Sequence, residues 1–218
     1  VSRFKDLDRI KNEFIATASH DLKNPLTSIG GYAQLLGHAG PLNENQQDFV
    51  QRIQHSVKNM SELVQNMMSL AQSDLEATQK HESVEINAVL REMENEFVMQ
   101  AKVKMQSLAV SMPASPVQLS GDPLQLRQAL RNLIGNAIKY TPKGGEVTLT
   151  AKIMDTQALI EIKDNGYGIP ASDLPFIFDR FYRVRSGKNK EEEGNGLGLA
   201  IVKSIIEQHN GQISVESE

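Results

Sequence analysis

The stretch Asn132-Leu133-Ile134-Gly135-Asn136-Ala137-Ile138-Lys139-Tyr140 is the most informative part of the chain. Its apolar residues recur every three or four positions, which predicts an amphipathic helix over residues 122–140. Asn132 and Asn136 lie four positions apart and share the polar face with the lysine and tyrosine that end the stretch. Asn is a poor helix former, so this pair needs a reason. Amide oxygens are hard ligands that suit Mg²⁺ together with phosphate oxygens, although solvated amides are the plain alternative.

A second cluster, Asp164-Asn165-Gly166-Tyr167-Gly168-Ile169-Pro170, directly follows a predicted strand. A carboxylate at the end of a strand can accept a hydrogen bond from an exocyclic amine such as that of adenine. Glycines allow the backbone to approach a flat ring closely. Taken alone, the cluster is equally consistent with a plain turn.

A third cluster, Gly194-Asn195-Gly196-Leu197-Gly198-Leu199, opens a predicted helix. Glycine-rich backbone at a helix N-terminus presents N–H groups and the positive end of the helix dipole to phosphates. A flexible loop is the alternative for this cluster alone. The chain contains no Gly-x-x-x-x-Gly-Lys-[Ser/Thr] sequence, which excludes a Walker-type phosphate loop.

Helical and alternating segments surround these clusters and predict an α+β domain. The expected helices cover residues 87–104, 122–140 and 198–209, and the expected strands cover residues 107–112, 146–153, 158–163 and 212–217. Residues 183–198 are charged and Gly-rich without an apolar period, which is typical of a mobile loop. Residues 72–83 are polar and aperiodic, so we place a linker at 76–83 and the domain at 84–218.

Residues 1–75 show two helical stripes and no strand pattern. The stripes consist of Phe4, Leu7, Ile10, Phe14, Leu22, Leu26, Ile29, Ala33 and Leu36, and then of Phe49, Ile53, Val57, Met60, Val64, Met67 and Ala71. Gly37 to Pro41 separate them, which predicts an antiparallel helical hairpin. A hairpin cannot bury both stripes alone, so we expect it to dimerise into a four-helix bundle. Packing onto the rest of the same chain is the alternative.

His20 stands on the first of these helices, in His20-Asp21-Leu22-Lys23-Asn24-Pro25. Asp21 can accept from one imidazole nitrogen and leave the other nucleophilic. Asn24 lies four positions on, on the same helix face. Pro25 removes a backbone hydrogen bond and predicts a kink one turn after the histidine, a natural two-state element. A lone His-Asp pair is more often an ordinary surface feature.

Composition excludes several classes of protein. The 218 residues include no cysteine, so disulfides, thiolate metal sites and a cysteine nucleophile are excluded, which fits a reducing compartment. The net charge of −4 argues against a nucleic-acid footprint. No apolar run approaches the roughly 18 residues of a membrane span. The chain begins at Val1 and ends in an expected strand, so we expect it to be a piece of a longer protein.

Together and in this order, the clusters resemble the catalytic core of two-component sensor histidine kinases. The segment at His20 is similar to the family's phosphoacceptor box, residues 132–141 to its Asn box, Asp164–Gly168 and Gly194–Leu199 to its two Gly boxes, and Phe176–Phe181 to its Phe box. The second half also resembles the wider group of Hsp90-type and MutL-type (GHKL) ATPases. The resemblance implies a helical hairpin that dimerises into a four-helix bundle, followed by an α/β sandwich ATP-binding domain of the Bergerat type.

The same resemblance implies roles for individual residues. His20 is the residue phosphorylated from ATP, Asp21 its acid/base and orienting partner, and Asn24 the residue that helps to place water for dephosphorylation. Asn136 holds Mg²⁺ with Asn132 alongside. The nucleotide contacts implied are Lys139, Tyr140, Asp164, Gly166, Gly168, Ile169, Arg183, Gly194, Gly196, Leu197, Gly198 and Leu199, with residues 183–195 as a lid.

The implied partners are a second copy of the chain, through residues 1–75, and a response regulator that docks near Thr27, Gly31 and Tyr32. The implied location is cytoplasmic, in a parent protein that can be membrane-anchored. The acceptor box departs from the family's commoner pattern, with Asp21 for Glu and Lys23-Asn24 for Arg-Thr, which bears on phosphatase efficiency. The family's C-terminal strand and hairpin are missing after Glu218, which leaves the last expected strand with an unpaired edge.

Two alternatives stay open on the sequence alone. A non-kinase GHKL-type ATPase explains the three clusters but not the His-Asp pair on a dimerising hairpin. A phosphotransfer scaffold with a silent ATP site predicts loss of Asn136 or Asp164, and both residues are present.

Overall fold

The computed structural model describes residues 21–73, 82–154, 157–184 and 194–217, with side chains up to residue 68 in the first range. The chain divides into two compact units, Val1–Leu75 and Glu76–Glu218. None of the helices in the described ranges is both long and apolar enough to cross a bilayer.

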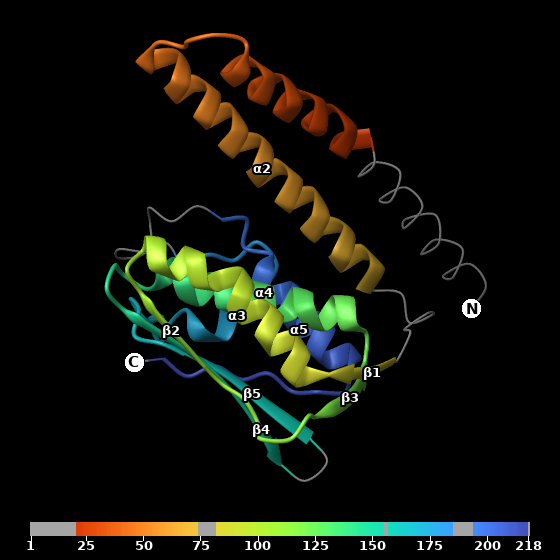
Figure 1. Ribbon diagram of the computed structural model, residues 1–218. Coiled ribbons are helices and arrows are strands. Elements are labelled where there is room, and N and C mark those ends of the chain that lie inside the picture. Colours follow the sequence, from red (N-terminus) through yellow and green to blue (C-terminus); the bar gives the residue numbers. More distant parts are fainter. Residues whose placement is uncertain (1–20, 74–81, 155–156, 185–193, 218) are drawn as a thin grey trace, which may run out of the picture. The chain divides into compact units, whose positions relative to one another are not determined.

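The first unit is the predicted antiparallel pair of helices (Figure 1). Residues 21–38 are helical without interruption at Pro25, and helix α2 (Glu44–Ser73) follows after a short turn. A capping box starts α2, because Asn43 Oδ1 accepts from the Gln46 N–H (2.9 Å) and Gln46 Oε1 accepts from the Asn43 N–H (3.0 Å). The kink expected at Pro25 stays a prediction.

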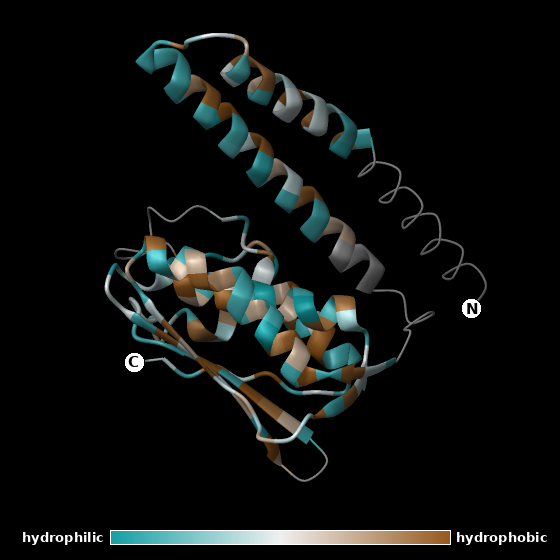
Figure 2. Cartoon of the chain, in the orientation of Figure 1, coloured by the Kyte–Doolittle hydropathy of each residue, from teal (hydrophilic) through white to brown (hydrophobic). Residues whose placement is uncertain are grey.

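The apolar stripes of this unit are only partly covered by each other. Leu26 and Ala33 are buried, whereas the large apolar residues around them are exposed. The exposed members of the two stripes are Leu22, Ile29, Leu36, Phe49, Ile53, Met60 and Met67. Figure 2 shows these helices with hydrophobic and hydrophilic residues alternating along their visible faces. One copy of the hairpin therefore leaves much of its apolar surface in water.

The second unit is an α/β sandwich, as predicted. Its elements, in chain order, are β1 (Glu82–Glu85), α3 (Ile86–Val103), β2 (Ser107–Ser111), β3 (Gln118–Gly121), α4 (Pro123–Tyr140), β4 (Glu146–Met154), β5 (Gln157–Asp164), the short 3₁₀ helix Leu174–Phe176 and α5 (Gly198–Gln208). Among the described residues, the larger sheet has the order β2-β4-β5, with β2 parallel and β5 antiparallel to β4. Helices α3, α4 and α5 cover one face of it (Figure 1).

The core lies between these helices and the sheet. Strand β4 buries every second residue, Val147, Leu149 and Ala151, because successive side chains of a strand point to opposite faces. Helix α4 buries Ile134 and Ile138 four positions apart, and this stripe packs into the same cluster. Burial of this stripe turns the opposite face of α4, with its two Asn residues, away from the core.

Two expectations about strands need correction. Residues 211–217 form no strand ladder in the described structure, although Ile213 and Val215 keep the alternating half-burial that led to the prediction. Alternation reports on which side faces the core, but a strand also needs backbone pairing with a neighbour. Conversely, β1 and β3 pair as a small sheet that was not predicted, and β1 begins within the range assigned to the linker. Strands of four residues are too short for a period to show.

Candidate functional site

Helix α4 is the element on which the site is built. It begins at Asp122, whose Oδ1 accepts from the backbone N–H groups of Leu124 (2.8 Å) and Gln125 (3.2 Å), with Pro123 in the first turn. On its polar face, Asn132 and Asn136 are half-buried. The Asn132 Nδ2 is fully shielded from solvent and has no hydrogen-bond partner among the described atoms. A shielded amide donor without a partner is rare in a folded protein and calls for an explanation.

The start of helix α5 lies against this pair of asparagines. A Cβ placed on Gly198 would be 3.7 Å from Asn132 Oδ1 and 3.9 Å from Asn136 Nδ2. The loop before it is shaped locally, because Asn195 Oδ1 accepts from the Leu197 N–H (3.0 Å) and Gly196 has a φ of +69°. The structure therefore brings the first and third sequence clusters together, with a helix N-terminus facing the amides.

The second cluster packs against the last turn of α4. Asp164 ends β5, and its Oδ1 accepts from the Gly166 N–H (2.9 Å). The Tyr167 N–H donates to the Tyr140 carbonyl oxygen (3.1 Å). A Cβ on Gly166 would lie only 2.6 Å from that same carbonyl oxygen, so the close approach of the two backbones requires glycine. Gly168 follows with a φ of +68°.

Lys139 lies at the loop that leads into α5. Its Nζ lies 5.1 Å from the centre of the Tyr140 ring, and a Cβ on Gly194 would be 3.0 Å from the same Nζ. A lysine ammonium thus stands beside the loop that leads into α5, where the backbone N–H groups of a helix start also attract anions. This combination favours phosphate groups.

The remaining predicted contacts lie at the edges of this arrangement. Ile169 donates its N–H to Ser217 Oγ (2.7 Å), so the C-terminal segment reaches the second cluster. Leu197 is fully buried and Leu199 half-buried at the start of α5. Arg183 is exposed, and most of the expected lid, including residues 185–193, falls outside the described residues.

The Phe-box segment joins the third cluster through its backbone. Phe181 donates its N–H to the Gly196 carbonyl oxygen (2.9 Å), although it has a φ of +65° and its side chain is 62% exposed. Beside it, the Tyr182 hydroxyl donates to Asp173 Oδ1 (2.7 Å), and this hydrogen bond raises the pKa of Tyr182 above its usual value. Sequence reasoning missed this pair, because its members lie nine positions apart in a segment without a regular period.

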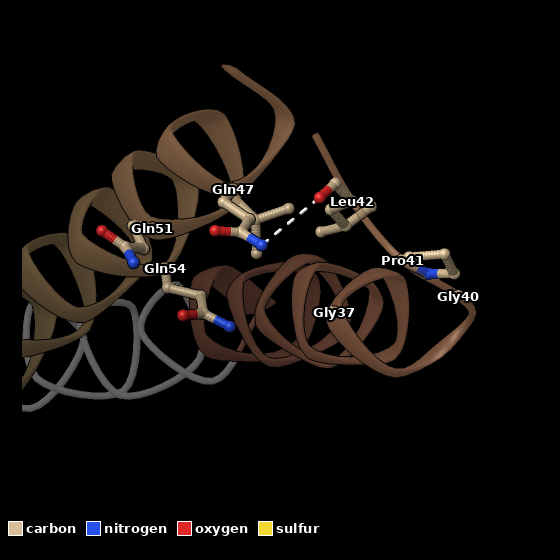
Figure 3. A pocket seen from close by; sticks show the side chains of 8 residues that line it. Gly37, Gly40, Pro41, Leu42, Gln47, Gln51 and Gln54 are labelled. Carbon is tan, nitrogen blue, oxygen red and sulfur yellow. Dashed lines mark hydrogen bonds between the residues drawn. The ribbon is translucent and has the colours of Figure 1, made fainter. Parts of the chain in front are cut away.

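The phosphoacceptor segment belongs to the other unit. His20 lies outside the described residues, whereas Asp21 and Asn24 are exposed on the first helix. The residues expected to face a response regulator, Thr27, Gly31 and Tyr32, are also exposed on that helix. A separate pocket lies at the turn of the hairpin, where Gln47 Nε2 donates to the Leu42 carbonyl oxygen (Figure 3). No predicted site residue lines that pocket.

The residues of the nucleotide region fit a cation held jointly with phosphates. The described part of the chain has no group of three or more His, Cys, Asp or Glu residues that could hold a metal alone. Amide oxygens on α4 can supply one or two hard ligands, and Mg²⁺ in nucleotide sites commonly takes few protein ligands with the rest from phosphates and water. The unpartnered Asn132 Nδ2 beside Gly198 is a donor, so it suits a phosphate oxygen, and only the amide oxygens can face the cation.

A helical hairpin followed by this sandwich defines a class of protein, an ATP-binding domain of the GHKL type joined to a helical module. The family described as His Kinase A (phospho-acceptor) domain matches residues 10–76. The family of histidine kinase-, DNA gyrase B- and HSP90-like ATPases matches residues 121–218. The chain therefore carries the catalytic core of a two-component histidine kinase.

Individual relatives agree. The phosphate regulon sensor protein PhoR of Pseudomonas aeruginosa is 34% identical over 100% of this chain and 49% of its own length. The sensor histidine kinase WalK of Bacillus subtilis is 31% identical over 100% of this chain and 36% of its own length. The crystal structure of full-length ShkA in complex with AMPPNP has a TM-score of 0.73 and 29% identity, over 90% of this chain and 41% of that one. The chain thus spans half or less of these relatives.

Proposed function

We propose that this chain transfers the γ-phosphoryl group of Mg-ATP to His20 and that the phosphoryl group then passes to an aspartate of a response regulator. The observation that supports this most is the meeting of α4 and α5, where Gly198 lies against Asn132 and Asn136. That contact builds a phosphate site in the same chain as the phosphoacceptor segment. The proposed units are the hairpin 1–75, the linker 76–83, whose last two residues already belong to β1, and the ATP-binding domain 84–218.

The adenine end of the site uses Asp164. One carboxylate oxygen already accepts from the Gly166 N–H, which fixes the orientation of the group. The other oxygen is then directed to accept from the exocyclic amine of adenine. The glycines on both sides leave space for the flat ring.

The phosphate end uses charge and backbone donors together. Lys139 and the N–H groups at the start of α5 neutralise the triphosphate, as a loose phosphoryl-transfer transition state requires. Asn136 offers its amide oxygen to Mg²⁺, which when bound supplies charge neutralisation between phosphate oxygens. The shielded Nδ2 of Asn132 donates to a phosphate oxygen, which gives that group the partner it lacks among the described atoms.

The acceptor half uses His20 and its neighbour. Asp21 orients the imidazole and takes its proton as the new P–N bond forms and the bond to the ADP leaving group breaks. Asn24, exposed on the first helix, is proposed to place the water that hydrolyses the aspartyl phosphate of the response regulator. Thr27, Gly31 and Tyr32 form the proposed docking face for the response regulator. ATP and response regulators are cytoplasmic, so a core with this function works in the cytoplasm.

One labelling experiment tests the proposal. The chain is incubated with γ-labelled ATP and Mg²⁺, and the bound label is tested for stability in acid and in base. We expect an acid-labile, base-stable phosphate that is absent from His20→Gln and present in His38→Gln, a matched control at an exposed histidine of the same unit. Label that persists in His20→Gln refutes the assignment.

The same experiment separates the alternatives. Release of phosphate without labelling indicates a clamp-type ATPase, and absence of ATP binding indicates a silent scaffold. Asn136→Ala and Asp164→Asn are expected to remove ATP turnover while the chain remains a dimer on gel filtration. Dissociation in either variant contradicts a role in nucleotide binding for that residue and indicates a structural one.

We also propose a homodimer formed by the hairpin. The exposed apolar stripes support it, because a continuous row of exposed large apolar side chains usually marks an interaction surface. A second copy of the same hairpin offers the same stripes with matching spacing, which suits an isologous interface. Light scattering that finds a monomer at micromolar concentration contradicts this proposal.

A further inference from the structure

The last turn of helix α4 is held from outside by two side chains of the turn after α3. Lys104 Nζ donates to the carbonyl oxygens of Ile138 (3.1 Å) and Lys139 (2.9 Å). Gln106 Nε2 donates to the carbonyl oxygens of Ile138 (3.0 Å) and Thr141 (2.6 Å). We call these two side chains, Lys104 and Gln106, the α4 clamp.

The clamp fills a need that every helix has at its C-terminus. The last four carbonyl groups of a helix have no partner within the helix. A cation there also interacts favourably with the negative end of the helix dipole. Gln106 is only 6% exposed, so it satisfies these carbonyls in a place that water does not reach. The clamp thus replaces solvent at the end of α4.

The turn that carries the clamp is strained. Met105 has a φ of +54°, its N–H donates to the Lys102 carbonyl oxygen, and the Gln106 N–H donates to the Ala101 carbonyl oxygen. These bonds form a Schellman ending, in which glycine usually takes the left-handed position. The Met105 side chain is 66% exposed, so its own packing does not explain the strain. The conformation instead sends the side chains on either side of Met105 toward α4.

The clamped turn contacts the nucleotide region at two points. Lys139 lies in it, with its Nζ beside Gly194. The Tyr140 carbonyl oxygen accepts the Tyr167 N–H and so holds the loop that follows Asp164. A shift of this turn therefore changes the position of Lys139 and of the loop after Asp164 at once.

From this arrangement we propose that Lys104 and Gln106 are positioning residues, which hold the last turn of α4 so that Lys139 and the loop after Asp164 meet the nucleotide in the right register. The inference rests on the proposed function, because the clamp is argued to position residues that contact ATP. The clamp itself is a property of the nucleotide-free chain. It therefore has a readout of its own.

The test uses the whole chain and three lysine variants. Lys104→Met removes the charge and the donors, Lys104→Arg restores both, and Lys102→Met removes an exposed charge at the same helix end as a matched control. We expect Lys104→Met to raise the KM for ATP about tenfold, on the scale of one charge-assisted hydrogen bond, with kcat changed less than about twofold. Lys104→Arg should return the KM toward wild type, and Lys102→Met should leave it unchanged.

Amide hydrogen exchange in the chain without nucleotide gives the independent readout. The Tyr167 amide should exchange faster in Lys104→Met than in Lys102→Met, while amides of the β4 core keep their protection. Gln106→Glu, which faces the same carbonyls with an acceptor, should raise the KM further. A wild-type KM in Lys104→Met, or a loss of protection spread evenly over the domain, overturns the proposal.

Failure of the two proposals can be told apart. If the wild-type chain neither binds nor hydrolyses ATP, the proposed function fails, and the Tyr167 amide still reports whether the clamp holds the loop. If the wild-type chain labels normally while Lys104→Met changes neither KM nor the Tyr167 amide, only the clamp proposal fails.

Discussion

Helices α4 and α2 carry apolar stripes of the same spacing, but the two stripes have opposite fates. Ile134 on α4 is 1% exposed, whereas Ile53 on α2 is 40% exposed and Phe49 one turn earlier is 62% exposed. Within its own unit, α4 packs on a sheet and two helices. In the described part of the hairpin unit, α2 has one other helix to pack on, residues 21–38. Period alone specifies a helix and its apolar face. It does not specify whether the partner is in the same chain.

The largest expected effect is on stability, and it tests the contrast between the two helices directly. Ile134→Ala removes buried methyl groups in a closed core and should lower the free energy of unfolding of the ATP-binding unit by about 2–5 kcal/mol. Ile53→Ala should cost less than about 1 kcal/mol while the chain is monomeric, because that side chain is already partly in water. Urea denaturation at two protein concentrations measures both. Equal losses for the two variants in the monomer would contradict the contrast.

The second prediction tests whether the loop before α5 depends on the close approach of the Gly196 backbone to the backbone of Phe181 and Tyr182. Gly196→Ala combines a φ of +69° with a Cβ 2.7 Å from the Phe181 carbonyl carbon and from the Tyr182 carbonyl oxygen. Gly144→Ala is the matched control, since it has a φ of +82° but no atom within 4 Å of its Cβ. We expect the control to cost roughly 1–2 kcal/mol for the left-handed conformation alone.

Gly196→Ala should cost about 1–3 kcal/mol more than the control, the usual range for overpacking. It should also weaken ATP binding, because this loop leads into α5 beside Asn132. Calorimetric unfolding and nucleotide titration check the two parts. If both variants bind ATP as the wild type does, the loop does not set the phosphate site.

The third prediction compares ion pairs on the same two helices. Arg131 on α4 makes two hydrogen bonds of 2.7 Å to Glu96 on α3, which raise the pKa of the guanidinium. Arg52 on α2 makes one of 2.8 Å to Asp48 four positions before it. Both arginines are at least half exposed, so solvent screens each pair strongly.

Double-mutant cycles should give about 0.5–1 kcal/mol for Arg131 with Glu96 and about 0.3–0.5 kcal/mol for Arg52 with Asp48. The first joins two helices in a fork geometry, whereas the second only supports a single helix turn. Both should shrink in 1 M salt, where the Debye length is about 3 Å. A larger coupling for Arg52 would show that the bidentate geometry adds nothing.

The sequence pattern predicted the elements whose structure depends on residues close by in the sequence. The stripe of α4, the alternation of β4 and the placement of glycines before α5 were all visible, and the structure confirms these elements. The contact of Gly198 with Asn132 was expected only through the family resemblance, because no local rule brings residues so distant in sequence together.

The parts that could not be predicted depend on distant partners. The left-handed Met105 carries none of the usual sequence signals, since glycine is the common residue there. Residues 211–217 alternate like a strand, but pairing depends on a neighbour that the pattern does not contain. The roles of the site residues, that of His20 above all, stay predictions that the labelling experiment tests.

The smallest expected effect concerns pH in the Phe-box segment. The hydrogen bond to Asp173 raises the pKa of Tyr182 in the folded chain above the usual value near 10. A raised folded-state pKa gives a stabilisation that is complete below the unfolded-state pKa and is lost as pH rises through the folded-state pKa. In the wild type, a small part of the free energy of unfolding should therefore be lost as Tyr182 ionises at alkaline pH. Tyr182→Phe should show no such loss, and the pH dependence of its stability should match the wild type below about pH 9.

Tyr32→Phe on the hairpin is the matched control, because that tyrosine is exposed on the other unit. Tyrosinate absorbance in the wild type and in Asp173→Asn locates the titration of Tyr182, which should move to lower pH when the carboxylate is replaced. Because Tyr182 and Asp173 both lie in the ATP-binding unit, Asp173→Asn should shift the titration of Tyr182 and leave the oligomeric state of the hairpin unchanged. If Asp173→Asn leaves the titration where it was, the hydrogen bond does not govern it. In that case the ordered contact between Phe176 and Tyr182, whose ring centres lie 5.6 Å apart, must hold the segment by packing alone.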